Sequence, residues 1–260
     1  MQAKAARGPI FLPLLVAALG VALLLENFLL LGDFRISALL PLVLVALGAW
    51  ILIRGDLGTR TARTFGITRG SVQSGTLEIS AGEVDVIIGG GARDGRLVEG
   101  QFARSSRPSL DVEATHAHLQ FLRSRTPWLS FADWQMRLAD DLPWDVLIST
   151  SIGQINADLG GLIVQGVTLA SGVGDIRLVS PSEAFDPVRV RSAAGDIHVI
   201  VPEGQAARVH VKPTRLFRVR VNETRYRVLE PGIYEAIKAN DESPRVDIYL
   251  RGTFGDAYLS

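Results

Sequence analysis

A repeat of 21 residues in the second half of the chain constrains the fold more than any other feature. Four apolar pairs follow one another at this interval: Val146-x-Ile148, Val167-x-Leu169, Val188-x-Val190 and Val209-x-Val211. Three glycines keep the same spacing, at Gly153, Gly174 and Gly195. One coil of this length cannot bury both of its faces, whereas stacked coils can. The repeat predicts a stacked β-solenoid with a 21-residue coil, regular over residues 144–211.

Alternating apolar and polar residues extend this interpretation to both sides of the regular array. Weaker copies of the repeat stand at Leu77-x-Ile79 and at Ile248-x-Leu250. Such alternation is typical of half-buried strands, and glycine at the turns supplies backbone angles that a side chain would forbid. We therefore predict that residues 76–260 form one all-β solenoid domain.

Three segments depart from the regular pattern. The stretch 55–75, rich in Gly, Thr, Ser and Arg, is predicted to be a linker. Two longer excursions, at 89–143 and 212–245, are expected to be longer strands, edge covers or caps of the solenoid. The only short helix that the pattern of this domain favours lies at 233–239.

The first 54 residues have a different character. Two apolar runs, at 9–25 and 36–53, are separated by a loop that holds Glu26, Asp33 and Arg35. Each run has the length of a short membrane span, so we predict a two-helix transmembrane hairpin at 1–54. The alternative for the first run is a cleaved signal peptide.

The orientation of this hairpin follows from its basic residues, because Lys and Arg gather on the cytoplasmic side of a membrane. The outer flanks hold six of them, at Lys4, Arg7, Arg54, Arg60, Arg63 and Arg69. The loop between the runs holds Arg35 alone. We expect a cell-membrane protein with two spans and with both termini in the cytoplasm.

The residue types narrow the possible chemistry. The chain has no cysteine, which excludes disulfides, thiol nucleophiles and thiolate metal sites. Its net charge of zero gives no indication of a nucleic-acid partner. His116 and His118 could point to the same side of a strand, but no third ligand is identifiable, so a solvated strand face is the preferred interpretation. We expect no catalytic residues, no metal and no cofactor.

An aspartate follows the glycine of several repeats, at Asp175, Asp196 and Asp256. A row of carboxylates can bind calcium or flank a glycosidic bond. Asp after Gly also favours tight turns, and the calcium-binding repeat pattern is absent. Turn chemistry is the preferred interpretation of this row.

Two clusters suggest contact surfaces. A basic stretch within 208–227 is the candidate site for a partner or for anionic lipid, through Arg215, Arg218, Arg220, Arg225 and Arg227. A solvated strand face is the preferred interpretation of this stretch, and few aromatic residues interleave to support nucleic-acid binding. The aromatic residues Trp128, Phe131, Trp134 and Trp144 are expected in the core, with an exposed partner-binding patch as the alternative.

Several segments resemble a known bacterial family. The segment Arg7 to Leu15, the triplet Glu26-Asn27-Phe28 and the residues Ile51 to Arg54 resemble the LiaI/LiaF-type membrane hairpin. The segments Trp134 to Leu138, Asp141 to Val146, Ser171 to Ile176 and Val201 to Gly204 resemble the toast-rack, or LiaF C-terminal-like, domain. The resemblance implies a non-enzymatic membrane protein of the cell-wall-active antibiotic response class with a stacked β domain. Relatives of this type regulate an envelope-stress histidine kinase, usually as inhibitors.

These observations leave three functions open. The first is a membrane-anchored scaffold or regulator of the envelope stress response, which contacts the lipid bilayer and a membrane or signalling protein, with a histidine kinase among the candidates. The second is a carbohydrate-binding or carbohydrate-active β-helix. The third is a structural protein that stacks on copies of itself.

Overall fold

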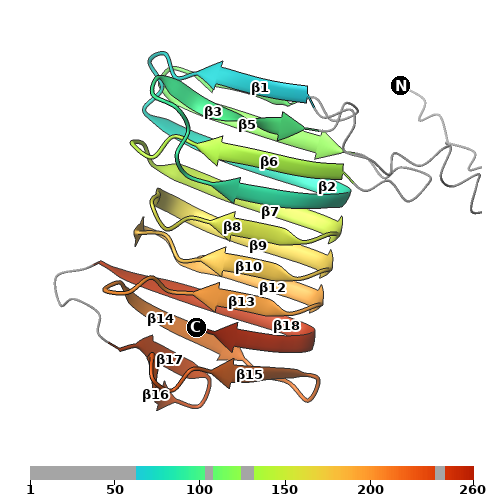
Figure 1. The fold of residues 1–260 in the computed structure, drawn as a ribbon, viewed down its shortest axis with the longest axis vertical. Helices are drawn as coiled ribbons and strands as arrows, with labels where there is room; N and C mark the ends of the chain where they lie inside the picture. The colour runs from blue at the N-terminus through green and yellow to red at the C-terminus, as the bar shows by residue number, and fades with distance from the viewer. Residues whose placement is uncertain (1–62, 103–107, 124–131, 238–243) are drawn as a thin grey trace, which may run out of the picture. The chain divides into compact units, whose positions relative to one another are not determined.

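The computed structural model describes residues 63–102, 108–123, 132–237 and 244–260, and all of them belong to a compact unit at 56–260. Every element in this part of the chain is a strand (Figure 1). The first nine are β1 (Arg63–Thr68), β2 (Ser74–Gly89), β3 (Arg96–Phe102), β4 (Ser109–Glu113), β5 (His116–Arg123), β6 (Ala132–Leu138), β7 (Trp144–Ile152), β8 (Ile155–Asp158) and β9 (Ile163–Val173). The others are β10 (Ile176–Val179), β11 (Glu183–Ala184), β12 (Val188–Ala194), β13 (Ile197–Ile200), β14 (Ala206–Lys212), β15 (Phe217–Val221), β16 (Tyr226–Glu230), β17 (Ile233–Ala236) and β18 (Arg245–Leu259).

The strands form two facing sheets that are joined coil by coil. Sheet A has the order β1-β3-β6-β2-β8-β10-β13-β18-β15. Sheet B has the order β4-β5-β2-β7-β9-β12-β18-β14-β17-β16, with β11 also beside β9. The long strands β2 and β18 bend from sheet B into sheet A, so each of them supplies both halves of one coil (Figure 1).

The core consists of apolar rows that run along the solenoid axis. One row in sheet B joins Leu119, Leu77, Val146, Val167, Val188, Ile248 and Val209 through in-register pairing of parallel strands. None of these side chains is more than 2% exposed. Burial of each such side chain stabilises the fold by about 1.5–3 kcal/mol. The apolar pairs of the repeat therefore lie on one continuous core, as the solenoid prediction requires.

The order of the coils differs from the order of the sequence. Strand β18 lies between the coil of β12 and β13 and the coil of β14 and β15, so Ile248 pairs with both Val188 and Val209. Near the other end, β2 lies between the coil of β5 and β6 and the coil of β7 and β8. The regular series therefore ends at β13, and Val209 belongs to a coil that is not adjacent to Val188.

The predicted fold class needs a correction. We expected an N-terminal two-helix transmembrane hairpin followed by an all-β solenoid, but the described residues contain strands and no helix. Across these same residues, no helix has the length and hydropathy needed to cross a membrane. The hairpin was assigned to 9–25 and 36–53, which lie outside the described residues.

Other segments also differ in detail from the expectation. Strand β1 lies within the stretch 55–75 that was assigned to a linker, and pairs with β3 at the edge of sheet A. The segment 233–239 begins with strand β17 rather than with a helix, because Ile233 and Tyr234 pair with β14. The two excursions provide the antiparallel pairs β3–β6 and β4–β5 at one end, and β14–β17 and β16–β17 at the other.

The repeat glycines form the corner between the two sheets. Gly153, Gly174 and Gly195 have φ of 146°, 143° and 141°. A Cβ atom on Gly174 would overlap the carbonyl oxygen of Gly153 in the neighbouring coil. Only glycine combines this backbone angle with such a close approach of the next coil. The predicted role of the glycines is confirmed.

The cap at the β16 end of the solenoid contains a buried phenol. Burial raises the pKa of Tyr226 from 10.0 to about 12, and its hydroxyl donates a hydrogen bond to the carbonyl oxygen of Ser260 at 3.3 Å. The unfolded chain releases this proton more readily, so stability should fall as the pH rises from about 10 to about 12. Urea titrations across that range should show a larger loss for the wild type than for Tyr226→Phe. An equal loss in both would contradict this assignment.

Candidate functional site

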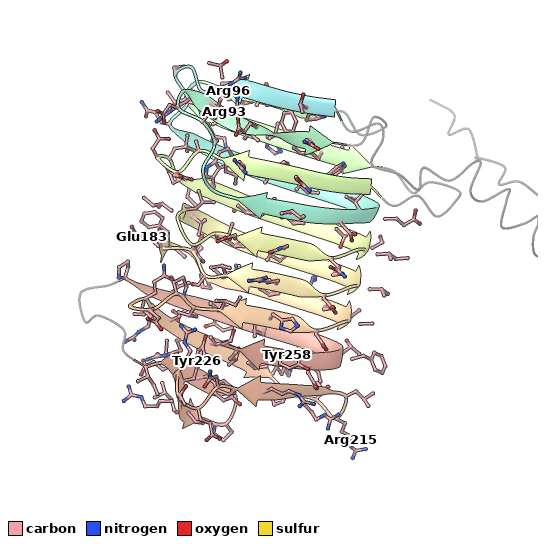
Figure 2. All side chains as sticks on the ribbon, viewed as in Figure 1. Arg93, Arg96, Glu183, Arg215, Tyr226 and Tyr258 are labelled. Carbon is pink, nitrogen blue, oxygen red and sulfur yellow. The ribbon has the colours of Figure 1, made fainter. Side chains whose placement is uncertain are left out.

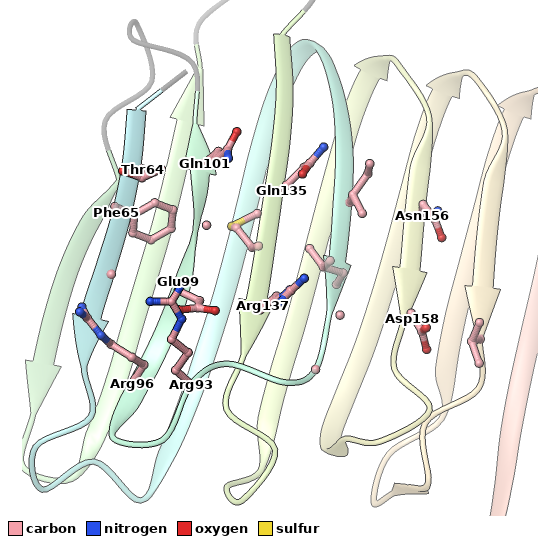
Figure 3. Close-up of a pocket in the computed structure, with 18 of the residues that line it drawn as sticks. Thr64, Phe65, Arg93, Arg96, Glu99, Gln101, Gln135, Arg137, Asn156 and Asp158 are labelled. Carbon is pink, nitrogen blue, oxygen red and sulfur yellow. The ribbon is translucent and has the colours of Figure 1, made fainter. Parts of the chain in front are cut away.

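A polar groove crosses the outer face of sheet A near its β1 end (Figure 3). It has a volume of about 830 Å³ and spans β1, β3, β6, β2, β8 and β10. Its polar lining consists of Thr64, Arg93, Arg96, Glu99, Gln101, Gln135, Arg137, Asn156, Asp158 and Arg177. Amide, carboxylate and guanidinium groups thus share one floor, which suits a ligand that both donates and accepts hydrogen bonds.

The register of sheet A explains why these side chains meet. Outward positions of neighbouring strands lie side by side, about 4.8 Å apart. One row therefore runs through Thr64, Gln101, Gln135, Ile87, Asn156, Arg177, His198, Tyr258 and Arg220. The row begins in the groove and extends beyond it along the whole sheet.

The far part of this row is aromatic and cationic. The rings of His198 and Tyr258 are stacked, with centroids 4.6 Å apart and an interplanar angle of 3°. The guanidinium carbon of Arg220 lies 5.8 Å from the Tyr258 ring centroid. These planar groups stiffen the face, because each ring limits the rotamers of its neighbour.

Some charged side chains of the groove form ion pairs, whereas others have no oppositely charged partner. Arg93 and Glu99 form an ion pair with 3.5 Å between Nε and Oε2. Arg137 and Arg177 are exposed, and within the described residues neither forms an ion pair. Arg96 is likewise exposed and without an ion pair among these residues, so three cations remain available in the groove for a carboxylate or phosphate of a ligand.

The aspartate row has a structural role. The carboxylate of Asp85 accepts a hydrogen bond from the backbone N–H of Gln154 at 2.7 Å, and Asp175 does the same for Asp196 at 2.8 Å. Asp196 in turn accepts from the N–H of Asp256 at 2.8 Å. Each carboxylate thus joins its own coil to the next one. In the part of the chain that the structure covers, no three acidic or histidine side chains gather as a metal site.

Asp196→Ala should therefore lower the free energy of unfolding by about 1–2 kcal/mol, because the N–H of Asp256 loses its acceptor. Asp196→Asn keeps an acceptor oxygen and should cost less than half of that. Urea denaturation of the three proteins checks the order. A calcium-dependent rise in the wild-type midpoint would instead support a metal role for the row.

The five arginines of the candidate contact site do not share one surface. Arg218 and Arg220 lie on β15 and bind Asp256, with Nε–Oδ distances of 3.7 and 2.8 Å. Arg225 donates a hydrogen bond to the carbonyl oxygen of Val201 at 2.6 Å. Arg227 pairs with Glu235, and Arg215 is exposed in the turn before β15.

The ion pairs around Glu235 join strands that the fold brings together. The hydrogen bond from Arg227 is the main cause that holds the pKa of Glu235 below its usual value. Arg208 and Arg245 also contact Glu235, at 3.4 and 3.7 Å. Four of the seven basic residues in the stretch 208–227 therefore bind the carboxylate of Glu235 or Asp256, namely Arg208, Arg218, Arg220 and Arg227.

The histidine and tryptophan residues considered as candidate sites have structural contacts. His116 contacts the hydroxyls of Ser74 and Thr76 at 2.8 and 3.0 Å, and His118 contacts Glu78 at 3.2 Å. Trp134 and Trp144 are fully buried, which confirms their assignment to the core. Trp128 and Phe131 lie outside the described residues.

The sequence did contain a signal for the groove that we missed. Asn156, Arg177 and His198 follow one another at the 21-residue spacing, one position after the inward Ile155, Ile176 and Ile197. The inward positions of the repeat reveal the core, whereas these outward positions reveal the exposed row.

Comparison with one solved structure supports the fold. The crystal structure of a candidate cell adhesion protein from Clostridium sporogenes is similar, with 15% identity, a TM-score of 0.65 and coverage of 76% of this chain and 97% of that one. A candidate adhesin from Bacteroides fragilis is 13% identical, with a TM-score of 0.32 and coverage of 79% and 100%. No curated protein matches the chain.

A family model is more informative than these structures. Residues 57–200, more than half of the chain, match the N-terminal domain of toast_rack, DUF2154. The matched range includes all residues that line the groove and the regular coils from β7 to β13. With its stacked coils, glycine corners and continuous core rows, this β-solenoid protein belongs to the toast-rack family.

Proposed function

We propose that this protein is a non-enzymatic scaffold or regulator of the bacterial envelope stress response, which binds a protein partner on the outer face of sheet A. The observation that carries the proposal is the in-register polar row that begins in the groove and crosses the sheet. Hydrogen bonding on both sides of each inner strand holds this row rigid. Its side chains are thus preorganised, which lowers the entropic cost of binding.

The chemistry of the face supports binding rather than catalysis. The aspartate row at the corner of the coils serves coil-to-coil hydrogen bonds, and His116, which lies on sheet B, contacts two hydroxyls. The free guanidinium groups of Arg137 and Arg177 favour a partner surface that combines carboxylates with hydrogen-bonding groups. The family resemblance supports a signalling protein at the cytoplasmic side of the cell membrane, with a histidine kinase as the first candidate.

Site-directed photocrosslinking can test this proposal, because the chain has no cysteine of its own. A crosslinker on Gln135→Cys reports on the groove, and one on Ser149→Cys reports on the exposed outer face of sheet B. In native membranes, the groove position should capture one membrane or signalling protein that the control position does not. Arg137→Glu with Arg177→Glu should reduce this capture about tenfold.

The opposite result is equally clear. Equal capture from both positions, or capture that survives the double charge reversal in a folded protein, would contradict a partner site in the groove. Circular dichroism of each variant separates loss of binding from loss of folding.

A glycan ligand is the second candidate for the groove. The amides of Gln101, Gln135 and Asn156 stand beside carboxylate and guanidinium groups, and such groups hydrogen-bond sugar hydroxyls. Titration of the wild type and Asn156→Ala with cell-wall oligosaccharides, followed by NMR, would test it. Binding that the substitution weakens would favour this candidate over the protein partner.

A further inference from the structure

A cluster of cations occupies the outer face of sheet B near its β14 end. We call Arg189, Arg191, Arg251, Lys212 and Arg215 the cationic patch, and all five are exposed. Arg191, Arg251 and Lys212 stand at directly paired positions of β12, β18 and β14. Arg189 lies two residues before Arg191 on β12, and Arg215 follows Lys212 in the turn after β14.

This arrangement places like charges beside one another. Paired positions of neighbouring strands are about 4.8 Å apart, and like charges at such positions destabilise a sheet. Yet in the part of the chain that the structure covers, no member of the patch forms an ion pair. The nearby Arg208, Arg227 and Arg245 all contact Glu235 instead. The described residues therefore supply no carboxylate partner for the patch.

Two large apolar side chains border the same patch. Phe254 is 52% exposed and Leu216 is 58% exposed. They belong to neighbouring coils, because the N–H of Gly255 donates a hydrogen bond to the carbonyl oxygen of Leu216 at 3.0 Å. Phe254 follows Arg251 by three residues, and Leu216 directly follows Arg215. Figure 2 shows Arg215 at this corner, where the side chains project away from the solenoid.

The acidic groups beside this corner are largely compensated. Asp256 follows Phe254 on the sheet A side, where Arg218 and Arg220 bind its carboxylate. Asp196 accepts a hydrogen bond from the backbone N–H of Asp256. Asp247, on the sheet B side, contacts His210 at 3.7 Å. Among the described residues, the cations of the patch thus lie beside the two apolar side chains without a carboxylate partner.

We propose that the cationic patch, with Phe254 and Leu216, is a contact surface for an anionic lipid bilayer. Basic side chains bind the negative surface of a membrane, and adjacent apolar side chains gain by entering its interface. The patch is spread across three strands and a turn, which fits an extended charged surface better than a small anion. Leu216 gains little from a nucleic acid, whereas lipid would cover it. The inference rests on the proposed membrane-side location of the protein.

The test uses the full chain with a single cysteine at Thr253, carrying an environment-sensitive fluorophore. Thr253 is exposed and adjoins Phe254. Its emission should shift to the blue with phosphatidylglycerol–phosphatidylcholine vesicles but not with pure phosphatidylcholine, and high salt should remove the shift. The same label on Phe185→Cys, which lies in another turn of the solenoid and is 68% exposed, should not respond. Other attachments of the chain to the vesicle would affect both labels alike.

The charge variants complete the test. Arg191→Gln, Arg251→Gln and Lys212→Gln together should weaken the vesicle-dependent shift about 100-fold in lipid concentration. No shift at Thr253, an equal shift with neutral vesicles, or an unchanged shift in a folded triple variant would each overturn the proposal. If the triple variant does not fold, the salt dependence of the wild type decides. Crosslinking from Gln135 is a separate readout, so failure here does not imply failure of the partner site.

Discussion

A chain shortened by residues 245–260 is expected to lose its cooperative unfolding transition. Strand β18 forms an interior coil of the solenoid. Five of its side chains are at most 2% exposed: Val246, Ile248, Leu250, Ala257 and Leu259. Loss of one buried Leu or Ile side chain costs about 2–5 kcal/mol, and whole domains are stable by only about 5–15 kcal/mol. The coils on both sides would also lose their hydrogen-bonded neighbour. Thermal melting followed by circular dichroism checks this expectation.

Single substitutions within β18 provide the matched comparison. Ile248→Ala should lower the free energy of unfolding by about 2–5 kcal/mol and leave the transition cooperative. Tyr249→Ala, at the adjacent position with a side chain that is 43% exposed, should cost less. A shortened chain that still melted cooperatively near the wild-type temperature would show that the coils on either side of β18 can close the gap.

The second large effect is expected at the glycine corner. Gly174→Ala should destabilise the domain by about 3–5 kcal/mol, because alanine resists the backbone angle and its Cβ would meet the carbonyl oxygen of Gly153. The Cβ position is fixed by the backbone and the atoms that it would meet are backbone atoms, so side-chain rearrangement cannot relieve the clash. Urea denaturation of the purified variant measures the loss.

Gly161→Ala is the control for this substitution. A Cβ on Gly161 would meet nothing within 4 Å, and its φ lies outside the range that disfavours side chains. We expect a change within about 0.5 kcal/mol. A loss of stability in Gly174→Ala as small as that in Gly161→Ala would mean that the corner does not require glycine.

Much of the fold could be predicted because the apolar pairs of one coil face those of the next. The spacing of Val146, Val167 and Val188 is the pairing register of β7, β9 and β12. Sequence spacing could not reveal where β18 lies, because Ile248 pairs with Val188 across about sixty residues of intervening chain. A matching pattern at the C-terminus shows that a coil exists there but not which coils it joins.

The candidate contact site was harder to predict for a related reason. Arg218 and Arg227 are close in sequence, but they belong to different sheets and bind Asp256 and Glu235. In contrast, Arg191, Arg251 and Lys212 are scattered along the chain and meet only because β18 separates β12 from β14. The number of charges in a short stretch of sequence shows neither that nearby arginines separate onto different sheets nor that distant cations meet.

The position of β18 also determines when this domain can be completed during synthesis. The ribosome releases residues 245–260 after the other strands that the structure describes, yet they form a coil between two earlier ones. Until then, β12 and β14 lack the strand that pairs with both of them. Domains usually fold as units while they emerge. Here the nascent chain must keep the two coils apart, or let them separate again, so that residues 245–260 can enter. Truncation before these residues leaves unpaired strand edges that can bind other chains.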